Sequence, residues 1–334
     1  MSGIKDVARR AGVSVGTVSN VLNRPQLVAE RTREHVLAAI EDLDFVRNES
    51  ARQLRAGASR TIAVVVLDIA NPFFTDVVAG VESVADEQDA LVVVSSSGGD
   101  EQRERRQLAR LAEMRVMGVL ITPVSAPSLE ILRRSEVPAV LVDRAAGPGE
   151  RWTAGAVAVD DVRGGRAVGE HLVHRGHTRT AFLGGPLSVP QVRERQQGFL
   201  EVVGAASTTT VLTAGLSVAE GRRAAAVVLD LPQDERPTAV FCANDLVALG
   251  VLQQCLLRGV RVPEDLAIVG YDDIDYAASA AVPLSSVRQP REQLGRRAAE
   301  LLLGSGDEAR LAVFEPDLVP RASSARVLAP PTAG

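Results

Sequence analysis

The sequence has little cysteine, few aromatic residues and no long apolar run, and each shortage excludes a class of protein. Only two of its 334 residues are cysteines and ten are aromatic. Cys242 and Cys255 stand in apolar sequence, at neither a metal-ligand spacing nor the spacing of a disulfide framework. We interpret both as reduced thiols in or near a core. Because no apolar stretch approaches the about 20 residues that span a bilayer, we expect no membrane protein.

Sequence signatures of secretion and of enzymatic chemistry are absent as well. The first 23 residues alternate charged and apolar side chains, without the apolar core and cleavage site of a secretory signal, so we expect the chain to stay in the cytoplasm. The nucleotide motifs G-x-G-x-x-G and G-x-x-x-x-G-K-[ST] and the nucleophile motif G-x-S-x-G are missing. His171, His174 and His177 recur every three residues, but Gly176 places the last one beyond the helix. We therefore predict no enzyme, no cofactor and no metal site.

Charge is distributed unevenly along the chain. The formal net charge is −5, yet residues 1–60 hold 10 Lys and Arg against 7 Asp and Glu, and the rest of the chain holds 27 against 35. Only the N-terminal part therefore suits a polyanion. Its basic residues flank two predicted helices, where phosphate contacts would be needed: Lys5, Arg9, Arg10, Arg24, Arg31 and Arg33.

Two short helices joined by a turn are predicted between Ile4 and Asn23. Apolar residues recur at a spacing of three and four on both helices: Ile4, Val7, Ala8 and Ala11 on the first, and Val18, Val21 and Leu22 on the second. Gly12 permits a left-handed turn, and Ser14 can cap the second helix. The third helix, Glu30 to Leu43, is predicted to pack Val36, Leu37, Ile40 and Leu43 as one stripe. The pattern is typical of a helix-turn-helix, although an ordinary helical hairpin in a core remains the alternative.

In a helix-turn-helix the start of the second helix lies in the DNA major groove. Asn20 can offer a donor and an acceptor to an adenine edge, Val15 can meet a thymine methyl, and Gly16 permits close approach. The residues that we predict to contact DNA in this region are Lys5, Ser14, Val15, Gly16, Thr17, Ser19, Asn20, Asn23 and Arg33.

From Thr61 the sequence alternates β-branched runs with amphipathic helices, which predicts βαβ units and parallel sheets. The expected strands are 62–67, 91–95, 118–122, 139–142, 180–183, 210–212, 239–242 and 267–270. The expected helices are 74–87, 101–114, 164–175, 191–203, 218–231, 245–258 and 291–303. Four units, a break near Asp160 and four further units favour two doubly wound subdomains. A ligand would bind in the cleft beyond the C-terminal ends of the strands.

The predicted strand ends carry side chains suited to a polyol. Carboxylates and amides accept from or donate to hydroxyls, arginine donates from a fixed fork, and an aromatic face covers a sugar ring. These residues are Asn71, Phe73, Phe74, Asp143, Arg144, Arg193, Arg195, Asn244 and Asp272. The neighbouring Asp161, Asp245 and Asp273 can equally be helix caps.

Together the segments IKDVARRAGVSVGTVSNVLN, LRAGASRTIAVVV, ANDLVALG and VPEDLAIVGYDD resemble a LacI-family transcriptional regulator, over about residues 3–325. The resemblance implies a homodimer whose heads bind a palindromic operator, through the major groove and the central minor groove. It also implies a hinge helix in which Arg52 contacts DNA and Leu54 wedges into the minor groove. Arg47 stands where a proline is usual, which bears on how the hinge helix starts.

The core resembles a type I periplasmic sugar-binding protein, and its best match is the ribose-binding branch. The matching positions are Asn71, Phe73, Phe74, Asp143, Arg144, Arg195, Asn244, Asp272 and Gln289. An expected aromatic is missing, because the loop that would supply it reads Gly215, Leu216, Ser217. The resulting domain prediction is a head at 1–46, a hinge and linker at 47–60, a first subdomain at 61–160 and 290–309, a second at 161–289 and 310–328, and a tail at 329–334.

These features predict a cytoplasmic, sequence-specific repressor of carbohydrate uptake or catabolism genes, whose operator affinity is changed by a small sugar, a monosaccharide, in the cleft. A purine-type or other non-sugar effector acting as co-repressor is the alternative. A sugar-active enzyme or a solute-binding protein fits the sequence less well.

The hinge prediction can be tested by comparing Leu54→Ala with Arg33→Ala. A wedge acts by deforming one base step, so Leu54→Ala should weaken operator binding more than binding to random DNA. Phosphate contacts act on any sequence, so Arg33→Ala should weaken both alike. Gel retardation on both DNAs measures this, and equal losses for Leu54→Ala would sink the hinge assignment.

Overall fold

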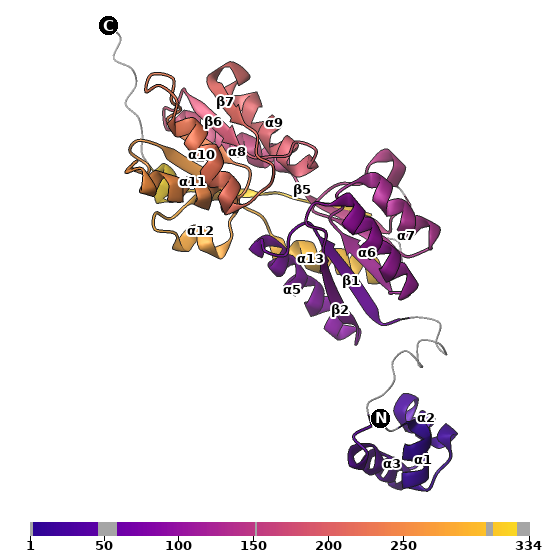
Figure 1. Ribbon diagram of the computed structural model, residues 1–334. Helices are drawn as coiled ribbons and strands as arrows, with labels where there is room; N and C mark the ends of the chain where they lie inside the picture. Colours follow the sequence, from indigo (N-terminus) through magenta and orange to yellow (C-terminus); the bar gives the residue numbers. More distant parts are fainter. Residues whose placement is uncertain (1–2, 46–58, 151, 305–309, 326–334) are drawn as a thin grey trace. The chain divides into compact units, whose positions relative to one another are not determined.

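The computed structural model describes residues 3–45, 59–150, 152–304 and 310–325 (Figure 1). The chain divides between Ser59 and Arg60 into two compact units, a small head and a large core. Arg47, Arg52 and Leu54, on which the hinge prediction depends, lie outside the described residues. Within the described ranges, none of the helices has the length and apolar character that crossing a membrane requires.

Within residues 3–45, the head contains three α-helices and a short 3-10 turn: α1 (Ile4–Ala11), α2 (Val15–Asn23), η1 (Pro25–Leu27) and α3 (Glu30–Asp42). Gly12 ends α1 with φ of 67°, a left-handed conformation that glycine adopts at little cost. The Oγ of Ser14 accepts a hydrogen bond of 3.0 Å from the backbone N–H of Thr17. The predicted turn and the predicted cap are thus both confirmed.

The core of the head is built from small apolar side chains of all three helices. The fully or nearly buried ones are Val7, Ala8, Val18, Val21, Val36 and Ala39. The prediction that Leu37 belongs to the buried stripe is wrong, because its side chain is 49% exposed. Val36, Ala39 and Leu43 follow one another at helical spacing, so the centre of the buried face passes through Ala39 and leaves Leu37 outside it.

The large unit contains two six-stranded sheets, each with a doubly wound order. The first has the order β11-β5-β4-β3-β1-β2, and its neighbouring strands are parallel. Its strands are β1 (Thr61–Val66), β2 (Leu91–Ser96), β3 (Gly118–Ile121), β4 (Ala139–Val142), β5 (Gly155–Val159) and β11 (Leu311–Phe314). The second has the order β12-β10-β9-β8-β6-β7, with β12 antiparallel to β10. Its strands are β6 (Thr180–Leu183), β7 (Thr208–Val211), β8 (Ala239–Cys242), β9 (Ala267–Asp272), β10 (Ser285–Arg288) and β12 (Asp317–Val319).

Helices cover both faces of each sheet, as parallel strands require. They are α5 (Pro72–Glu87), α6 (Glu101–Glu113), α7 (Glu130–Arg134), α8 (Asp161–His174), α9 (Pro190–Val203), α10 (Val218–Leu229), α11 (Asp245–Leu257), α12 (Asp275–Ser279) and α13 (Arg291–Leu303). Short 3-10 segments are η2 (Ala126–Leu129), η3 (Pro148–Glu150), η4 (Ala205–Ser207) and η5 (Ala322–Ser324). Along β1, Ile62 and Val64 face the layer of α5 and α13, whereas Ala63 and Val65 face that of α6 and α7. Each sheet therefore lies between two apolar layers.

The C-terminal part of the core crosses between the two sheets, which the sequence did not predict. We expected residues 310–328 to belong wholly to the second subdomain. Instead β11 pairs with β5 of the first sheet, and only β12 joins the second sheet. The alternating residues on either side of Glu315 and Pro316 look like one strand, and pairing partners far away in the chain decide the division. The strands β5 and β10 and the helices α7 and α12 were also missed.

Among the described helices, three pairs approach so closely that each helix of a pair presents a glycine to the other. A Cβ atom on Gly80 of α5 would lie 2.0 Å from the carbonyl oxygen of Glu292, and one on Gly295 of α13 would lie 1.8 Å from that of Val77. The same arrangement joins α8 to α9 and α10 to α11 through the pairs Gly165 with Gly198 and Gly221 with Gly250. Real Cβ atoms are not found at such distances, so any side chain there must push the helices apart.

We therefore predict that Gly295→Ala lowers the free energy of unfolding of the core by about 1–3 kcal/mol or more, the usual cost of overpacking. Chemical denaturation with a fluorescent or circular-dichroism signal measures the change. Gly149→Ala is a suitable control, because no atom lies within 4 Å of its added Cβ. Unchanged stability of Gly295→Ala would mean that α5 and α13 are not held at this separation.

Candidate functional site

The exposed face of α2 carries most of the residues predicted to read DNA. Val18 and Val21 point into the head, whereas the opposite side of the helix presents Val15, Gly16, Ser19, Asn20 and Asn23, half-buried or exposed. Asn23 Nδ2 donates to the backbone oxygen of Ser19 at 2.8 Å and to its hydroxyl at 3.2 Å. Ser19, Asn20 and Asn23 thus give this face of the helix polar groups, and a major groove is wide enough to admit an α-helix.

Basic side chains of the head are either exposed or held in weak surface pairs. Lys5 on α1 is exposed, and Arg33 on α3 pairs with Glu30 one turn before it. Exposed pairs of this kind contribute about 0–1 kcal/mol, so a DNA phosphate can replace Glu30 as the partner of Arg33.

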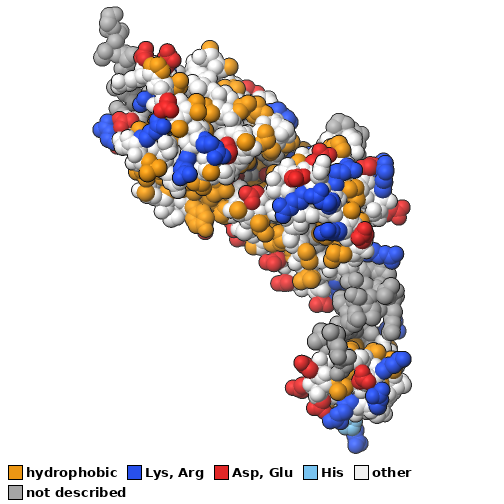
Figure 2. Space-filling model, viewed as in Figure 1, with side chains coloured by type: hydrophobic (Ala, Val, Ile, Leu, Met, Phe, Trp, Pro, Cys, Tyr) orange, Lys and Arg blue, Asp and Glu red, His pale blue; other side chains and the backbone are white. Residues whose placement is uncertain are grey.

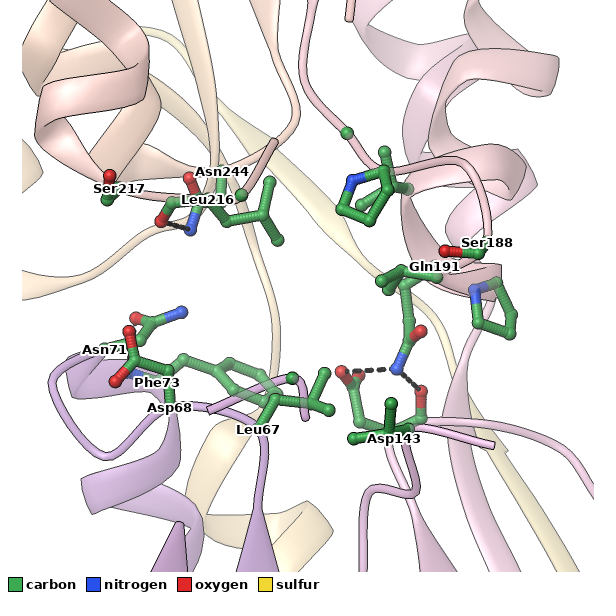
Figure 3. Close-up of a pocket in the computed structure, with 18 of the residues that line it drawn as sticks. Leu67, Asp68, Asn71, Phe73, Asp143, Ser188, Gln191, Leu216, Ser217 and Asn244 are labelled. Atoms are coloured by element: carbon green, nitrogen blue, oxygen red, sulfur yellow. Dashed lines mark hydrogen bonds between the residues drawn. The ribbon is translucent and has the colours of Figure 1, made fainter. Parts of the chain in front are cut away.

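A cavity of about 440 Å³ lies between the two subdomains of the core, at the C-terminal ends of the strands (Figure 3). Of the predicted ligand residues, those that line it are Asn71, Phe73, Phe74, Asp143, Arg195, Asn244 and Asp272. Figure 3 shows Asn71, Phe73 and Asp143 on one side of the opening and Leu216, Ser217 and Asn244 on the other. Phe73 and Phe74 stand edge to face, with ring centroids 5.0 Å apart. The cavity thus combines an aromatic wall with convergent polar groups, as small-molecule sites do.

Two aspartates hold corresponding places at the ends of central strands. Asp143 follows β4 with φ of 62°, and Asp272 ends β9 with φ of 103°. Residues other than glycine adopt these conformations at a cost, and such strain is concentrated at functional sites. Both carboxyl groups are buried and line the cavity.

Hydrogen bonds between side chains of the two subdomains cross the cleft. Asn71 Nδ2 donates to Asp272 Oδ2 at 3.3 Å, which joins α5 to β9. Gln191 Nε2, at the start of α9, donates to the backbone oxygen of Asp143 at 2.7 Å and to its Oδ2 at 3.0 Å. Gln191 was not predicted as a site residue. Its position one helical turn before Arg195, on the same helix face, was the signal that could have revealed it.

Arg195 is the charged centre of the second subdomain. Its Nε donates to Asp161 Oδ1 at 2.7 Å, and one terminal nitrogen donates to the carbonyl of Ala243 at 2.8 Å. The same nitrogen lies 3.6 Å from Asp272 Oδ1, and the guanidinium stacks 3.8 Å from the centre of the Tyr271 ring. Burial by itself would lower the pKa of Arg195, but Asp161 and Asp272 outweigh it and raise the pKa. Arg195 therefore stays charged and orients Asp272.

The carboxyl groups around Arg195 have raised pKa values. Burial raises the pKa of Asp272 from 3.8 to about 6, against the opposing effect of Arg195. Burial also raises the pKa of Asp143 well above its usual range, and the nearby charge of Asp161 adds to the shift. Perturbed carboxyl groups in a cleft are typical of functional sites.

Two predicted ligand residues do not reach the cavity. Arg144 turns away from it, forms an ion pair with Glu150 and lines a separate small hollow. Gln289 lies behind the site and donates through Nε2 to Asp272 Oδ1 at 2.8 Å. The pair Asp143 and Arg144 is adjacent in sequence, but consecutive residues after a strand point to different sides.

The three aspartates considered as helix caps have other partners. Asp161 binds Arg195, while Asp160 caps α8. Asp245 accepts from the Ser286 hydroxyl at 2.6 Å and from the Ile274 backbone N–H at 2.9 Å. Asp273 pairs with Arg288 and Arg321. The capping interpretation was therefore wrong for all three, and they brace the strand ends from behind. Asn71 and Asn244 cap α5 and α11 and line the cavity as well.

Comparison with known proteins agrees with this arrangement. The family described as "Bacterial regulatory proteins, lacI family" matches residues 3–48, and "Periplasmic binding protein-like domain" matches residues 169–324. The HTH-type transcriptional repressor PurR of Vibrio atlanticus is 34% identical over 97% of this chain and 98% of its own. The structure of the lac repressor dimer bound to operator and the anti-inducer ONPF has a TM-score of 0.83 at 28% identity, covering 97% of this chain and 99% of that one. A LacI-family regulator from Enterococcus faecium with bound ribose has a TM-score of 0.71 at 28% identity, covering 80% and 100%.

The raised pKa of Asp272 predicts how stability depends on pH. The folded chain keeps the Asp272 proton up to about pH 6, whereas an unfolded chain releases it near 3.8. Between these values the folded state binds more protons, so the contribution of Asp272 to stability falls as the pH rises. The free energy of unfolding of the wild type, minus that of Asp272→Asn, should therefore decrease by about 1–3 kcal/mol from pH 4 to pH 7.

Denaturant titrations of both proteins at several pH values give this difference. The sign of the change in this difference with pH, and not its absolute size, is diagnostic. A difference that is constant, or that increases with pH, would contradict the environment described for Asp272.

Proposed function

Since the chain belongs to the lacI family of bacterial regulatory proteins, we propose that it represses genes of carbohydrate uptake or catabolism and that a small sugar in the core cleft changes its affinity for operator DNA. Membership makes it a DNA-binding transcription repressor and not an enzyme. The observation that carries the sugar proposal is the cavity itself, in which an aromatic wall faces carboxylates and amides from both subdomains.

DNA recognition is assigned to the head. Val15, Gly16 and Asn20 contact base edges, and Lys5 and Arg33 contact phosphates. Ser14, Thr17, Ser19 and Asn23 line the same surface of α2 and serve contacts to the backbone or to bases. A single head makes few base contacts, so specific binding uses two heads on the half-sites of a palindrome. Arg52 and Leu54 are assigned to the central minor groove on the family resemblance.

The two heads belong to a homodimer. The lac repressor, which this chain resembles, was solved as a dimer on its operator. Exposed apolar side chains on two neighbouring elements of the second subdomain support a similar assembly: Leu256 (54% exposed), Leu257 (74%) and Tyr276 (59%). Figure 2 shows apolar side chains gathered over the region of α12. Exposed apolar side chains of this kind are typical of a protein–protein interface, and a second copy of the chain would remove their surface from water.

A monosaccharide is the effector that these groups fit. Phe73 and Phe74 can cover the apolar side of a sugar ring, and Asp143, Asn244 and Asp272 can bind its hydroxyls. The E. faecium regulator that resembles this chain holds ribose. The loop Gly215, Leu216, Ser217 stands where the ribose-binding branch has an aromatic, which leaves open a sugar larger than or different from ribose. A purine-type co-repressor is the second candidate, because the similar V. atlanticus repressor is named PurR.

The effector acts by closing the cleft. Asn71 and Asp143 belong to the first subdomain and Asp272 to the second, so a ligand that touches all three binds the closed form more tightly. Only this difference in affinity between the two forms can alter the spacing of the heads and therefore DNA binding. We expect the sugar to lower operator affinity, as an inducer does.

A panel of sugars and purines tests the proposal. A ligand bound only by the folded cleft raises the free energy of unfolding by about 2.7 kcal/mol at a hundredfold excess over its Kd. A sugar that raises the melting temperature should also release operator DNA, and Asp272→Ala should reduce sugar affinity about tenfold to a hundredfold. Wild-type sugar affinity and release in Asp272→Ala would remove the cleft as the effector site. Stabilisation by a purine that strengthens DNA binding would favour the second candidate.

Deleting residues 1–60 tests whether DNA binding belongs to the head and effector binding to the core. The core alone should not bind operator DNA, because every proposed DNA contact has been removed. It should bind the effector with unchanged affinity, because the residues of the cavity all follow Thr61. Gel retardation and calorimetry measure the two properties, and retardation of operator DNA by the truncated chain would contradict the assignment.

A further inference from the structure

Among the lining residues that the structure describes, four side chains are ionisable, and the cation among them is already committed. Asp68, Asp143 and Asp272 carry carboxyl groups, and Arg195 is the cation. Arg195 already binds Asp161, the Ala243 carbonyl and Asp272. The single lysine of the chain, Lys5, belongs to the head. A phosphate or carboxylate ligand would therefore meet carboxylates without a cation to balance its charge.

Helix N-termini are the other usual binding sites for anions, and at the cavity some of their N–H donors are missing and others are already capped. α5 and α9 begin with Pro72 and Pro190, which have no N–H. Three cap side chains that line the cavity each accept from one helix N–H group: Asn71 from Phe73 at 3.1 Å, Asn244 from Val247 at 3.0 Å, and Ser217 from Glu220 at 3.3 Å.

Arg103, near the rim, does not change this balance. Its terminal nitrogen would lie 3.5 Å from a Cβ on Gly98, but its side chain is exposed and does not line the cavity. At an exposed position a charge pair contributes little free energy of binding. That contribution is smaller than the cost of leaving a buried polar group unsatisfied.

Two buried oxygen atoms at the cavity lack a hydrogen-bond partner among the residues that the structure describes. Asp143 Oδ1 and Gln191 Oε1 have none, although the two residues are only 6% and 4% exposed. The amide of Gln191 cannot be turned to exchange its atoms, because both atoms that it meets on Asp143 are acceptors. Figure 3 shows this pair joined across the cleft by both hydrogen bonds. A ligand that donates hydrogen bonds would satisfy both atoms, and its hydrogen bond to Asp143 would favour the ionised form of that carboxyl group.

We propose that the effector carries no phosphate or other negative charge and donates hydroxyl or N–H hydrogens to Asp143 Oδ1 and Gln191 Oε1, so that this pair determines which effector is accepted. The proposal rests on the function proposed above, that the cleft holds an effector. It goes further in excluding sugar phosphates and nucleotides and in assigning a specificity role to Gln191. The pair also joins the two subdomains, so a ligand that binds it favours the closed cleft.

The charge requirement is tested on the full chain with matched probes. D-ribose, D-glucose, D-fructose and adenosine are each compared with their phosphate esters, and inorganic phosphate is compared with sodium chloride of equal ionic strength. We expect at least one uncharged probe to raise the melting temperature, its phosphate ester to bind at least a hundredfold more weakly, and inorganic phosphate to have no effect of its own. An ester that binds more tightly than its parent, or stabilisation by inorganic phosphate that persists in Arg103→Ala, would overturn the proposal.

If none of the uncharged probes binds, the sugar effector of the proposed function fails, while the esters and inorganic phosphate still decide the question of charge. In that case, the proposal is supported if every anion fails to bind, and it is overturned if any one anion binds. The two failures are thus distinguishable.

The specificity role is tested with Asp143→Asn, Gln191→Leu and deoxy analogues of the uncharged probe that binds. Each variant should bind that probe tenfold to a hundredfold more weakly than the wild type does. The deoxy analogue that lacks the contacting hydroxyl should bind the wild type and the variant with equal affinity. Glu87→Gln, an equal change of charge at the far end of α5, is the matched control and should leave affinity unchanged. A constant loss for every analogue would show that the pair acts only on structure and would overturn its role in specificity.

Discussion

The buried pairing of Arg195 with Asp161 and Asp272 is the interaction on which the rest of the cleft depends. It joins α8, α9 and β9, because Asp161 begins α8, Arg195 lies on α9 and Asp272 ends β9. Removing one partner from a buried charged group leaves the other uncompensated, which typically costs several kcal/mol. The close approach of α8 and α9 is part of the same arrangement, because a Cβ on Gly165 would lie 2.1 Å from the carbonyl oxygen of Arg195. The small side chains between the helices therefore decide where the guanidinium lies.

Asp272 connects Arg195 to the first subdomain. Its Oδ1 accepts a hydrogen bond from Gln289 and lies near Arg195, while its Oδ2 accepts from Asn71 across the cleft. Asn71 in turn caps α5, the helix that carries Phe73 and Phe74. A ligand that changes the partners of Asp272 thus acts on the helix that holds the aromatic wall. The bond between Gln191 and Asp143 is a second connection of the same kind, so the relation between the subdomains is set by a few polar contacts that a ligand can replace.

These contacts explain why acceptors dominate the cavity. Burial disfavours the charged forms of Asp143 and Asp272, and the structure compensates with one guanidinium and several amides instead of further cations. A site of this composition suits ligands that donate hydrogen bonds without bringing charge. The same residues therefore serve the structure, as links between subdomains, and recognition, as hydrogen-bonding partners.

The sequence by itself determined what depends on neighbours within a few turns of chain. The turn at Gly12, the cap at Ser14, the alternation of strands with helices and the ring of polar residues at the strand ends follow from local periodicity and side-chain chemistry, and seven of the nine predicted ligand residues line the cavity. Tertiary structure decided the rest. The division of 311–319 between two sheets depends on distant pairing partners, and the exposure of Leu37 depends on how three helices meet. The outward turn of Arg144, the bracing partners of Asp161, Asp245 and Asp273, and the reach of Gln191 to Asp143 depend on groups between 6 and 48 positions away along the chain. Local sequence cannot specify such contacts, because their energies arise only when the packed elements bring these groups together.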